Sequence, residues 1–273
     1  VLVMAALALL LGFALSFASN VFHVKKDPRL EQIMECLPGA NCGGCGFAGC
    51  ADYAEKIISE GVPVNKCPVG AAKTASEISQ IMGVEDSGDI VRMRAQVMCS
   101  GTNETTRKKY IYDDGASDCL AEMKLGGGNK GCKYACVGLG NCVTACQFGA
   151  MEIVDGVAKV NRDKCVGCGA CVDICPKSII KLVPQNAGTA VICSNKQKGA
   201  EARKACKNAC IGCKKCEKVC PHGAVSVVDN LAVIDYDKCT GCGACAEACP
   251  TGCLKKVCFP DLPAGTLAED LLN

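Results

Sequence analysis

The sequence predicts an α+β protein built from several small cysteine-rich units rather than from one large core. The chain of 273 residues contains 27 cysteines, far more than an ordinary globular protein. A stretch of 45 residues, from Cys132 to Pro176, recurs without a gap from Cys206 to Pro250. Each copy also holds two short apolar runs separated by Asp-Gly or Asp-Asn, which is the pattern of a β-hairpin.

The overall composition excludes some classes of function. Thirty Lys and Arg residues nearly balance 28 Asp and Glu residues, so the formal net charge is only +2. A protein that binds nucleic acid through a basic field carries a larger positive charge, so we expect no nucleic-acid partner. The chain has no Trp, five Tyr and six Phe, which excludes a large aromatic core.

The first residues of the chain predict a single transmembrane helix over residues 1–22. This stretch contains no charged side chain, and at about 1.5 Å per residue it spans about 33 Å, enough to cross the hydrocarbon core of a membrane. Lys25, Lys26 and Arg29 follow at once. By the positive-inside rule, they place the rest of the chain on the cytoplasmic side of the inner cell membrane, with lipid around residues 1–22. A cleaved signal peptide is the alternative.

Residues 23–85 predict a small helical domain that holds a metal. Its four cysteines, spaced C-x2-C-x4-C-x16-C, are Cys42, Cys45, Cys50 and Cys67. The glycines between them let backbone amides approach and donate to sulfur. Apolar residues at helical spacing predict helices over Ala51–Glu60 and Ala71–Met82. The alternative to an iron–sulfur cluster is a zinc ion held by the same four thiolates.

Three later runs of cysteines have the spacing C-x2-C-x2-C-x3-C followed by Pro. They begin at Cys165, Cys210 and Cys239. This is the run of bacterial ferredoxins, in which the fourth cysteine serves the other cluster of a pair. Disulfides suit short secreted chains, and zinc sites use separated pairs of cysteines, so both fit less well.

Two tandem 2[4Fe-4S] ferredoxin-like units are therefore expected. The first covers residues 86–185 with its lead-in, the second covers residues 186–258, and a tail over residues 259–273 ends the chain. Within them, we expect two hairpins, one formed by Met151–Val154 with Val157–Val160 and one formed by Val225–Val228 with Leu231–Ile234. We also expect a turn that leads into a strand over Ser178–Val183.

Cross-ligation predicts four sets of cysteines in these units, and about five [4Fe-4S] clusters with the N-terminal set. The sets are Cys132, Cys136, Cys142 and Cys175; Cys146, Cys165, Cys168 and Cys171; Cys210, Cys213, Cys216 and Cys249; and Cys220, Cys239, Cys242 and Cys245. The first set is irregular, because Leu139 stands where the second copy has Cys213. Cys206, the counterpart of Cys132, is a possible alternative ligand in the second unit.

Seven cysteines remain without a place in these sets: Cys36, Cys99, Cys119, Cys193, Cys206, Cys253 and Cys258. Cys99 and Cys193 occupy similar segments, VMCS and VICS, ahead of the two copies. Such thiols are either small buried apolar groups or ligands of a further cluster.

Motifs for bond-making catalysis are missing from the sequence. No G-x-G-x-x-G motif follows a predicted strand, so we expect no NAD or flavin site in this chain. His23 and His222 are the only histidines, and His222 is interpreted as a solvated turn residue. No catalytic residue is therefore assigned, and electron transfer is the chemistry that the cysteine runs support.

The order of these parts resembles the family formed by the B subunits of Rnf complexes. The resemblance rests on Pro38–Cys50 with Cys67-Pro68, and on Gly131–Phe148. The Rnf complex is a membrane-bound ferredoxin:NAD oxidoreductase that couples electron flow to Na⁺ or H⁺ translocation, hence a translocase.

The resemblance implies the role and the partners of this chain. It would accept electrons from soluble reduced ferredoxin and relay them through its clusters to other membrane and peripheral subunits, which carry the flavins and the NAD site. A redox-sensing or purely structural iron–sulfur module is the alternative. Basic residues near the second copy either dock ferredoxin or form a solvated face: Lys196, Lys198, Arg203, Lys204 and Lys207.

Overall fold

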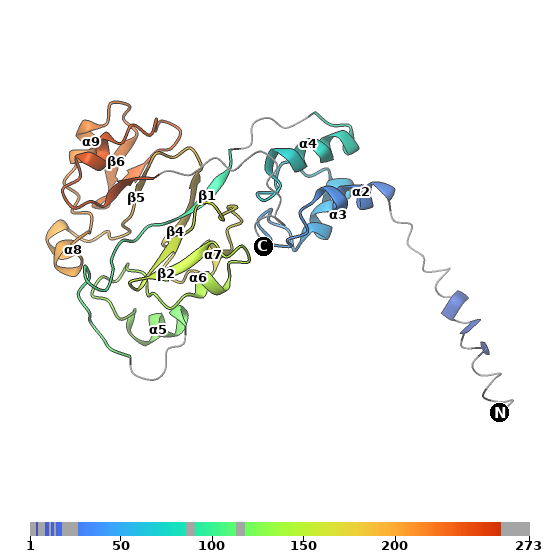
Figure 1. The fold of residues 1–273 in the computed structure, drawn as a ribbon, viewed down its shortest axis with the longest axis horizontal. Helices are drawn as coiled ribbons and strands as arrows, with labels where there is room; N and C mark the ends of the chain where they lie inside the picture. The colour runs from blue at the N-terminus through green and yellow to red at the C-terminus, as the bar shows by residue number, and fades with distance from the viewer. Residues whose placement is uncertain are drawn as a thin grey trace.

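The computed structural model describes residues 4, 9–10, 12–13, 15–17, 27–85, 91–112 and 118–257. Figure 1 shows a helical domain beside a larger part in which strands and short helices alternate. Among the described residues, no helix is both long and apolar enough to span a membrane. The transmembrane helix predicted over residues 1–22 lies largely outside the described residues, and Cys258 and the predicted tail over residues 259–273 lie wholly outside them.

The helical domain packs three helices around a small apolar core. They are α2 (Pro28–Cys36), α3 (Cys50–Glu60) and α4 (Ala71–Met82). The helices predicted from the sequence are confirmed in α3 and α4, both of which end at a glycine in the left-handed conformation. The side chains of Ile33, Tyr53 and Ile78 are almost fully buried between the helices. Cys45, Cys50 and Cys67 pack against this core, close to the first residues of α3 and α4.

The first ferredoxin-like unit contains two antiparallel pairs of strands. Strand β1 (Met93–Val97) pairs with β4 (Ile180–Pro184), and β2 (Met151–Val154) pairs with β3 (Val157–Val160). Its helices are α5 (Cys119–Gly126), α6 (Asn141–Thr144) and α7 (Ala170–Asp173). The predicted hairpin is confirmed, and its turn residues Asp155 and Gly156 have φ values of 50° and 72°. Both are left-handed, as a tight hairpin turn requires.

The second unit repeats this arrangement. Strand β5 (Thr189–Val191) pairs with β8 (Leu254–Lys256), and β6 (Val225–Val228) pairs with β7 (Leu231–Ile234). Its helices are α8 (Gly199–Ala205), α9 (Lys215–Val219) and α10 (Ala244–Glu247). The predicted hairpin is again confirmed, with Asp229 and Asn230 at φ values of 49° and 62°.

The lead-in segments of the two units join them. The Arg107 N–H donates to the Ala205 carbonyl at 3.2 Å, and the Lys207 N–H donates to the Thr105 carbonyl at 2.9 Å. These backbone bonds tie the segment ahead of α5 to the end of α8. The internal repeat is therefore also a packed pair of units in space (Figure 1).

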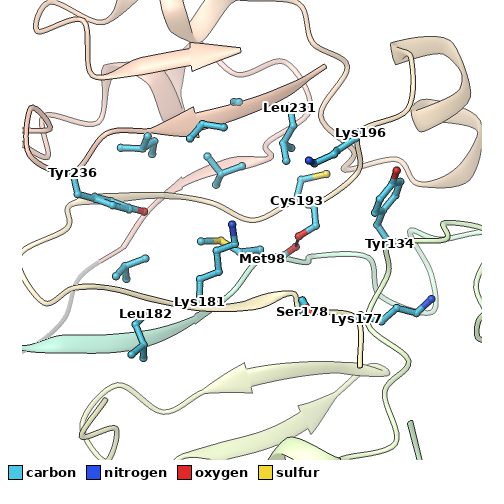
Figure 2. A pocket seen from close by; sticks show the side chains of 16 residues that line it. Met98, Tyr134, Lys177, Ser178, Lys181, Leu182, Cys193, Lys196, Leu231 and Tyr236 are labelled. Carbon is cyan, nitrogen blue, oxygen red and sulfur yellow. Dashed lines mark hydrogen bonds between the residues drawn. The ribbon is translucent and has the colours of Figure 1, made fainter. Parts of the chain in front are cut away.

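A groove of about 290 Å³ runs between the two units. Residues of β4 and β7 line it, together with the segment that follows β5. Figure 2 shows Lys181 and Tyr236 in this groove, and Cys193 beside Tyr134 and Lys196 at its other side. Cys193 is thus placed at the boundary between the units.

The helical domain packs against the first unit through its cysteine loop. A Cβ atom added at Gly44 would lie 2.6 Å from the Cys168 carbonyl oxygen, so the two loops touch at backbone level. Phe148 and Val166 of the first unit are buried, and Val69 of the helical domain packs against them. This contact brings two of the predicted cysteine sets next to each other.

Candidate metal centres

Four short helices place one buried cysteine of each ferredoxin-type set. These cysteines occupy the second position of α6, α7, α9 and α10: Cys142, Cys171, Cys216 and Cys245. The residue before each helix is left-handed, and three of these four residues are glycines. A left-handed residue bends the chain sharply, which allows the cysteines before and inside the helix to face the same space.

Backbone amides donate hydrogen bonds to cysteine sulfurs in three of the predicted sets. The donors and acceptors are Gly70 N–H to Cys67 Sγ (3.4 Å), Ala95 N–H to Cys165 Sγ (3.4 Å), Ala150 N–H to Cys146 Sγ (3.3 Å) and Ala224 N–H to Cys220 Sγ (3.3 Å). Hydrogen bonds of this kind stabilise the thiolate form that binds iron and tune the potential of a cluster. The chemistry of the donors therefore fits thiolate ligands.

Site 2 lies in the first unit and consists of Cys146, Cys165, Cys168 and Cys171. All four line one cavity, together with the apolar side chains of Phe148 and Met151. Burial raises the pKa of the Cys171 thiol to about 11, and the nearby Cys165 and Cys146 add to this effect. The structure thus brings together the four cysteines that cross-ligation predicts.

Site 3 differs from the predicted set. Its cavity is lined by Cys136, Cys142, Cys175 and also Cys119, whereas Cys132 does not line it. Burial raises the pKa of the Cys142 thiol to about 12, with contributions from Cys136, Cys119 and Cys175. In the structure Cys119, and not Cys132, therefore lies with Cys136, Cys142 and Cys175, which differs from the predicted grouping.

Local contacts explain why Cys119 lies there. It is the first residue of α5, whose N-cap Asp118 accepts hydrogen bonds from the Leu120 and Ala121 amides, both at 2.8 Å. The Cys119 N–H donates to Asn141 Oδ1 at 2.8 Å, which ties α5 to the start of α6. Cysteine spacing alone does not place Cys119 in a set. The signal that could have found it is Leu139, because the counterpart of the Cys210–Cys213–Cys216–Cys249 set then lacks one thiol and needs a ligand from elsewhere.

Sites 4 and 5 lie in the second unit. Site 4 consists of Cys210, Cys213, Cys216 and Cys249, and site 5 consists of Cys220, Cys239, Cys242 and Cys245. Burial raises the pKa of the Cys216 thiol to about 11, with Cys210, Cys213 and Cys249 nearby. Burial also raises the pKa of the Cys245 thiol, with Cys239 and Cys220 adding to the effect. The structure thus places Cys210, Cys213 and Cys249 near Cys216, and Cys239 and Cys220 near Cys245, while Cys213 and Cys242 are exposed.

Two further cysteines of the second unit lie near these sites. Cys253 is buried, and its sulfur lies 3.5 Å from Cys249 Sγ. Its counterpart in the first copy is the buried Ile179, so a small apolar role explains it. The alternative ligand Cys206 pairs in a β-bridge with Thr106 of the first unit instead of joining Cys216.

Site 1 is the set of the helical domain, Cys42, Cys45, Cys50 and Cys67. Burial raises the pKa of the Cys67 thiol to about 11, and the neighbouring Cys42 and Cys50 raise it further. A hydrogen bond from the Cys168 thiol lowers the pKa of Cys42 to about 6. This contact makes sites 1 and 2 direct neighbours.

At sites 2 and 3 the cysteine side chains surround a small cavity. Within the described ranges, no three His, Cys, Asp or Glu side chains are placed to hold a single metal ion. The cysteines of sites 2 and 3 border a free volume of about 20 Å³ in each case.

Comparison with family models matches three parts of the chain. A model for a putative Fe-S cluster matches residues 37–69, which contain site 1. A 4Fe-4S binding domain matches residues 158–181, and a 4Fe-4S dicluster domain matches residues 209–253. The matched ranges contain most cysteines of sites 1, 2, 4 and 5.

Three curated relatives are similar over most of the chain. The B subunit of the Na(+)-translocating ferredoxin:NAD(+) oxidoreductase complex of Acetobacterium woodii is 44% identical over 86% of this chain and 71% of its own length. The B subunit of the ion-translocating oxidoreductase complex of Methanosarcina acetivorans is 43% identical over 86% of this chain and 89% of its own. The B subunit of the proton-translocating ferredoxin:NAD(+) oxidoreductase complex of Clostridium ljungdahlii is 39% identical over 97% and 89%.

These identities extend over the helical domain and both ferredoxin-like units, so the chain belongs to the family of the B subunits of ion-translocating ferredoxin:NAD oxidoreductase (Rnf) complexes.

Proposed function

We propose that this chain accepts electrons from soluble reduced ferredoxin and passes them, through [4Fe-4S] clusters at sites 1 to 5, to other membrane and peripheral subunits of an Rnf complex. A [4Fe-4S] cluster held by four thiolates exchanges one electron at a time without making or breaking a bond to substrate. The observation that carries the proposal is the close packing of the site 1 loop on the site 2 loop, where Gly44 meets the Cys168 backbone and Cys42 and Cys168 pack on the same apolar cluster, because it joins site 1 to the ferredoxin-type sites.

The residues of this chain would hold and tune the clusters. The thiols that burial keeps protonated in the metal-free chain, such as Cys67 and Cys171, must lose their protons on binding iron. The amides of Gly70 and Ala150 would then stabilise the bound sulfurs. Apolar neighbours such as Phe148 exclude water from site 2.

The direction of transfer is also proposed. Exposed Cys213 and Cys242 make the second unit the more accessible end for a soluble donor. Site 1 lies in the domain that follows the apolar segment over residues 1–22, which we propose is a single-pass anchor in the cell membrane with the clusters on the cytoplasmic side. Site 1 would therefore deliver electrons to membrane partners, as part of an enzyme complex that translocates ions.

Metal analysis of the full chain tests this proposal. Protein purified without oxygen should contain at least about 20 iron atoms and as many acid-labile sulfides, and reduction should produce the signals of reduced [4Fe-4S] clusters. About eight iron atoms or fewer would contradict five sites. A full iron content that no reductant can reduce would instead indicate a structural role.

The variant Cys42→Ala tests the direction. It should still take up electrons from reduced ferredoxin in the second unit, while delivery to the assembled complex should fall at least about tenfold. Loss of electron uptake itself, with the iron at sites 2 to 5 intact, would show that site 1 is the entry point.

A further inference from the structure

Four cysteines outside the five sites converge between the two units. They line one small cavity, the interunit cavity: Cys99 and Cys132 from the first unit, and Cys193 and Cys206 from the second. Its free volume is about 20 Å³, the same as that of the cavities at sites 2 and 3. Three of its apolar lining residues are small or aliphatic: Ala135, Ile192 and Ala209.

The interunit cavity has an approximate two-fold symmetry that follows the internal repeat. The sequence repeat pairs Cys132 with Cys206, and the similar VMCS and VICS segments pair Cys99 with Cys193. The sulfurs of the second pair accept equivalent amide hydrogen bonds: Gly101 N–H (3.4 Å) and Cys136 N–H (3.4 Å) to Cys99, and Asn195 N–H (3.4 Å) and Cys210 N–H (3.3 Å) to Cys193. Cys99 Sγ in the first unit and Cys193 Sγ in the second therefore accept the same pattern of two amide hydrogen bonds.

The other two sulfurs have polar partners in the opposite unit. Asn195 Nδ2 of the second unit donates to Cys132 Sγ at 3.3 Å. Thr106 Oγ1 of the first unit lies 3.8 Å from Cys206 Sγ. Asn195 is 1% exposed, so these are contacts within the interface and not surface contacts.

A glycine leaves room at the centre of the cavity. A Cβ atom added at Gly101 would lie 3.5 Å from Cys206 Sγ and 3.6 Å from Cys99 Sγ. Sulfurs from two different units therefore border the same small space. Such a convergence of four thiols is the ligand set of a cluster or of a zinc ion.

A buried cation lies beside the same thiols. Lys130 is 5% exposed, and its Nζ donates to the carbonyls of Gly101 (2.9 Å) and Gly156 (2.6 Å). Among the described residues, no carboxylate forms an ion pair with it. A buried ammonium is costly unless negative charge compensates it, and a cluster with four thiolates carries such charge.

We propose that the four cysteines of the interunit cavity bind a sixth [4Fe-4S] cluster shared by the two units. The inference rests on the proposed iron–sulfur function and extends it. The amide of Cys136, a site 3 residue, contacts the sulfur of Cys99, and the amide of Cys210, a site 4 residue, contacts that of Cys193. The shared site therefore lies between sites 3 and 4. It completes a continuous series in the order site 1, site 2, site 3, interunit site, site 4 and site 5.

The test counts iron, sulfide and zinc in the anaerobically purified full chain, by metal analysis and native mass spectrometry. The wild-type chain should contain about 24 iron atoms and no zinc. The double variant Cys99→Ala with Cys193→Ala should lose about four irons and four sulfides, about one sixth of the total. Its matched control is Cys36→Ala, which removes a half-buried thiol of the helical domain and should keep all of the iron.

The outcomes separate this inference from the proposed function. A wild-type chain with about 20 iron atoms, with or without one zinc ion, overturns the sixth cluster but leaves the five sites. A chain without iron overturns both. If the double variant does not fold, the wild-type count still decides.

A second variant tests the role of Lys130. Lys130→Gln keeps hydrogen-bond donors but removes the positive charge. It should keep about 24 irons while one cluster becomes harder to reduce, seen as a shift of one midpoint potential to a more negative value. Unchanged potentials would contradict a cluster beside Lys130.

Discussion

We expect Cys119 to supply the thiol that the irregular cysteine run lacks, because it lines the same cavity as Cys136, Cys142 and Cys175. Cys119→Ala should remove the cluster of site 3 and lower the iron content by about four atoms per chain, because three thiolates hold a cubane poorly. Metal analysis checks this, with Cys36→Ala as the control. Full iron content in Cys119→Ala would contradict the assignment.

Gly44 sets how closely site 1 approaches site 2. An alanine methyl group there would lie 2.6 Å from the Cys168 carbonyl oxygen and 3.0 Å from its Cα, and both are backbone atoms. We expect Gly44→Ala to weaken the docking of the helical domain by about 1–3 kcal/mol.

Limited proteolysis between residues 82 and 93 measures this docking. Cleavage of Gly44→Ala should be several times faster than cleavage of the wild type, whereas Ala48→Ser, at another position of the same loop, should leave the rate unchanged. Equal rates for all three proteins would show that the contact does not hold the two parts together.

At the scale of an element, helix α5 begins with Cys119, the ligand that we propose for site 3, so the cap of this helix matters for that site. Asp118→Ala removes the acceptor for the Leu120 and Ala121 amides and should cost about 1 kcal/mol. Because Cys119 is the first residue of α5, we expect iron to leave site 3 faster when a chelator is added.

The conservative change Asp118→Asn separates capping from charge. It keeps an oxygen acceptor and should lose iron at nearly the wild-type rate. If Asp118→Asn behaved like Asp118→Ala, the negative charge and not the cap would explain the effect.

Much of the fold follows from local patterns in the sequence. Both hairpins could be predicted, since Asp155-Gly156 and Asp229-Asn230 interrupt alternating apolar residues. Helices α3 and α4 could be predicted from helical periodicity and the glycines that end them. The regular C-x2-C-x2-C-x3-C run from Cys165 likewise allowed the cysteines that line the cavity of site 2 to be predicted.

The remaining features depend on contacts between distant segments. Strand β1 (Met93–Val97) alternates apolar and polar residues, but its pairing with Ile180–Pro184, more than 80 positions away, cannot be predicted from that local pattern. Cys119 joins site 3 through Asn141, and the interunit cavity joins cysteines more than a hundred positions apart, such as Cys99 and Cys206. The spacing of cysteines predicts only groupings of cysteines that are close in sequence, so it cannot predict contacts between such distant residues.

At the scale of the whole molecule, the five proposed sites and the proposed interunit site would form one series from the helical domain to the exposed end of the second unit. Each neighbouring pair shares a unit or a direct contact, such as that of the Gly44 loop with Cys168. Electron tunnelling falls steeply with distance, so a continuous series is what a long-range relay requires.

Charge reversal in α8 tests whether the basic residues in and near this helix dock ferredoxin. Lys196 forms an exposed ion pair with Asp229 at 3.4 Å, while Arg203 and Lys204 lie in the last turn of α8. If this face docks an acidic ferredoxin, Arg203→Glu with Lys204→Glu should slow electron uptake about tenfold or more at low salt, and the difference should vanish at high salt. Equal uptake at low salt would identify a solvated face.

The most direct test of the account is electron transfer from reduced ferredoxin to the full chain. Mixed without oxygen, the iron-loaded chain should bleach and develop the paramagnetic signals of reduced [4Fe-4S] clusters, with one electron gained for each electron that ferredoxin loses. Ferredoxin that stays reduced beside a fully loaded, unbleached chain would contradict the electron-transfer role.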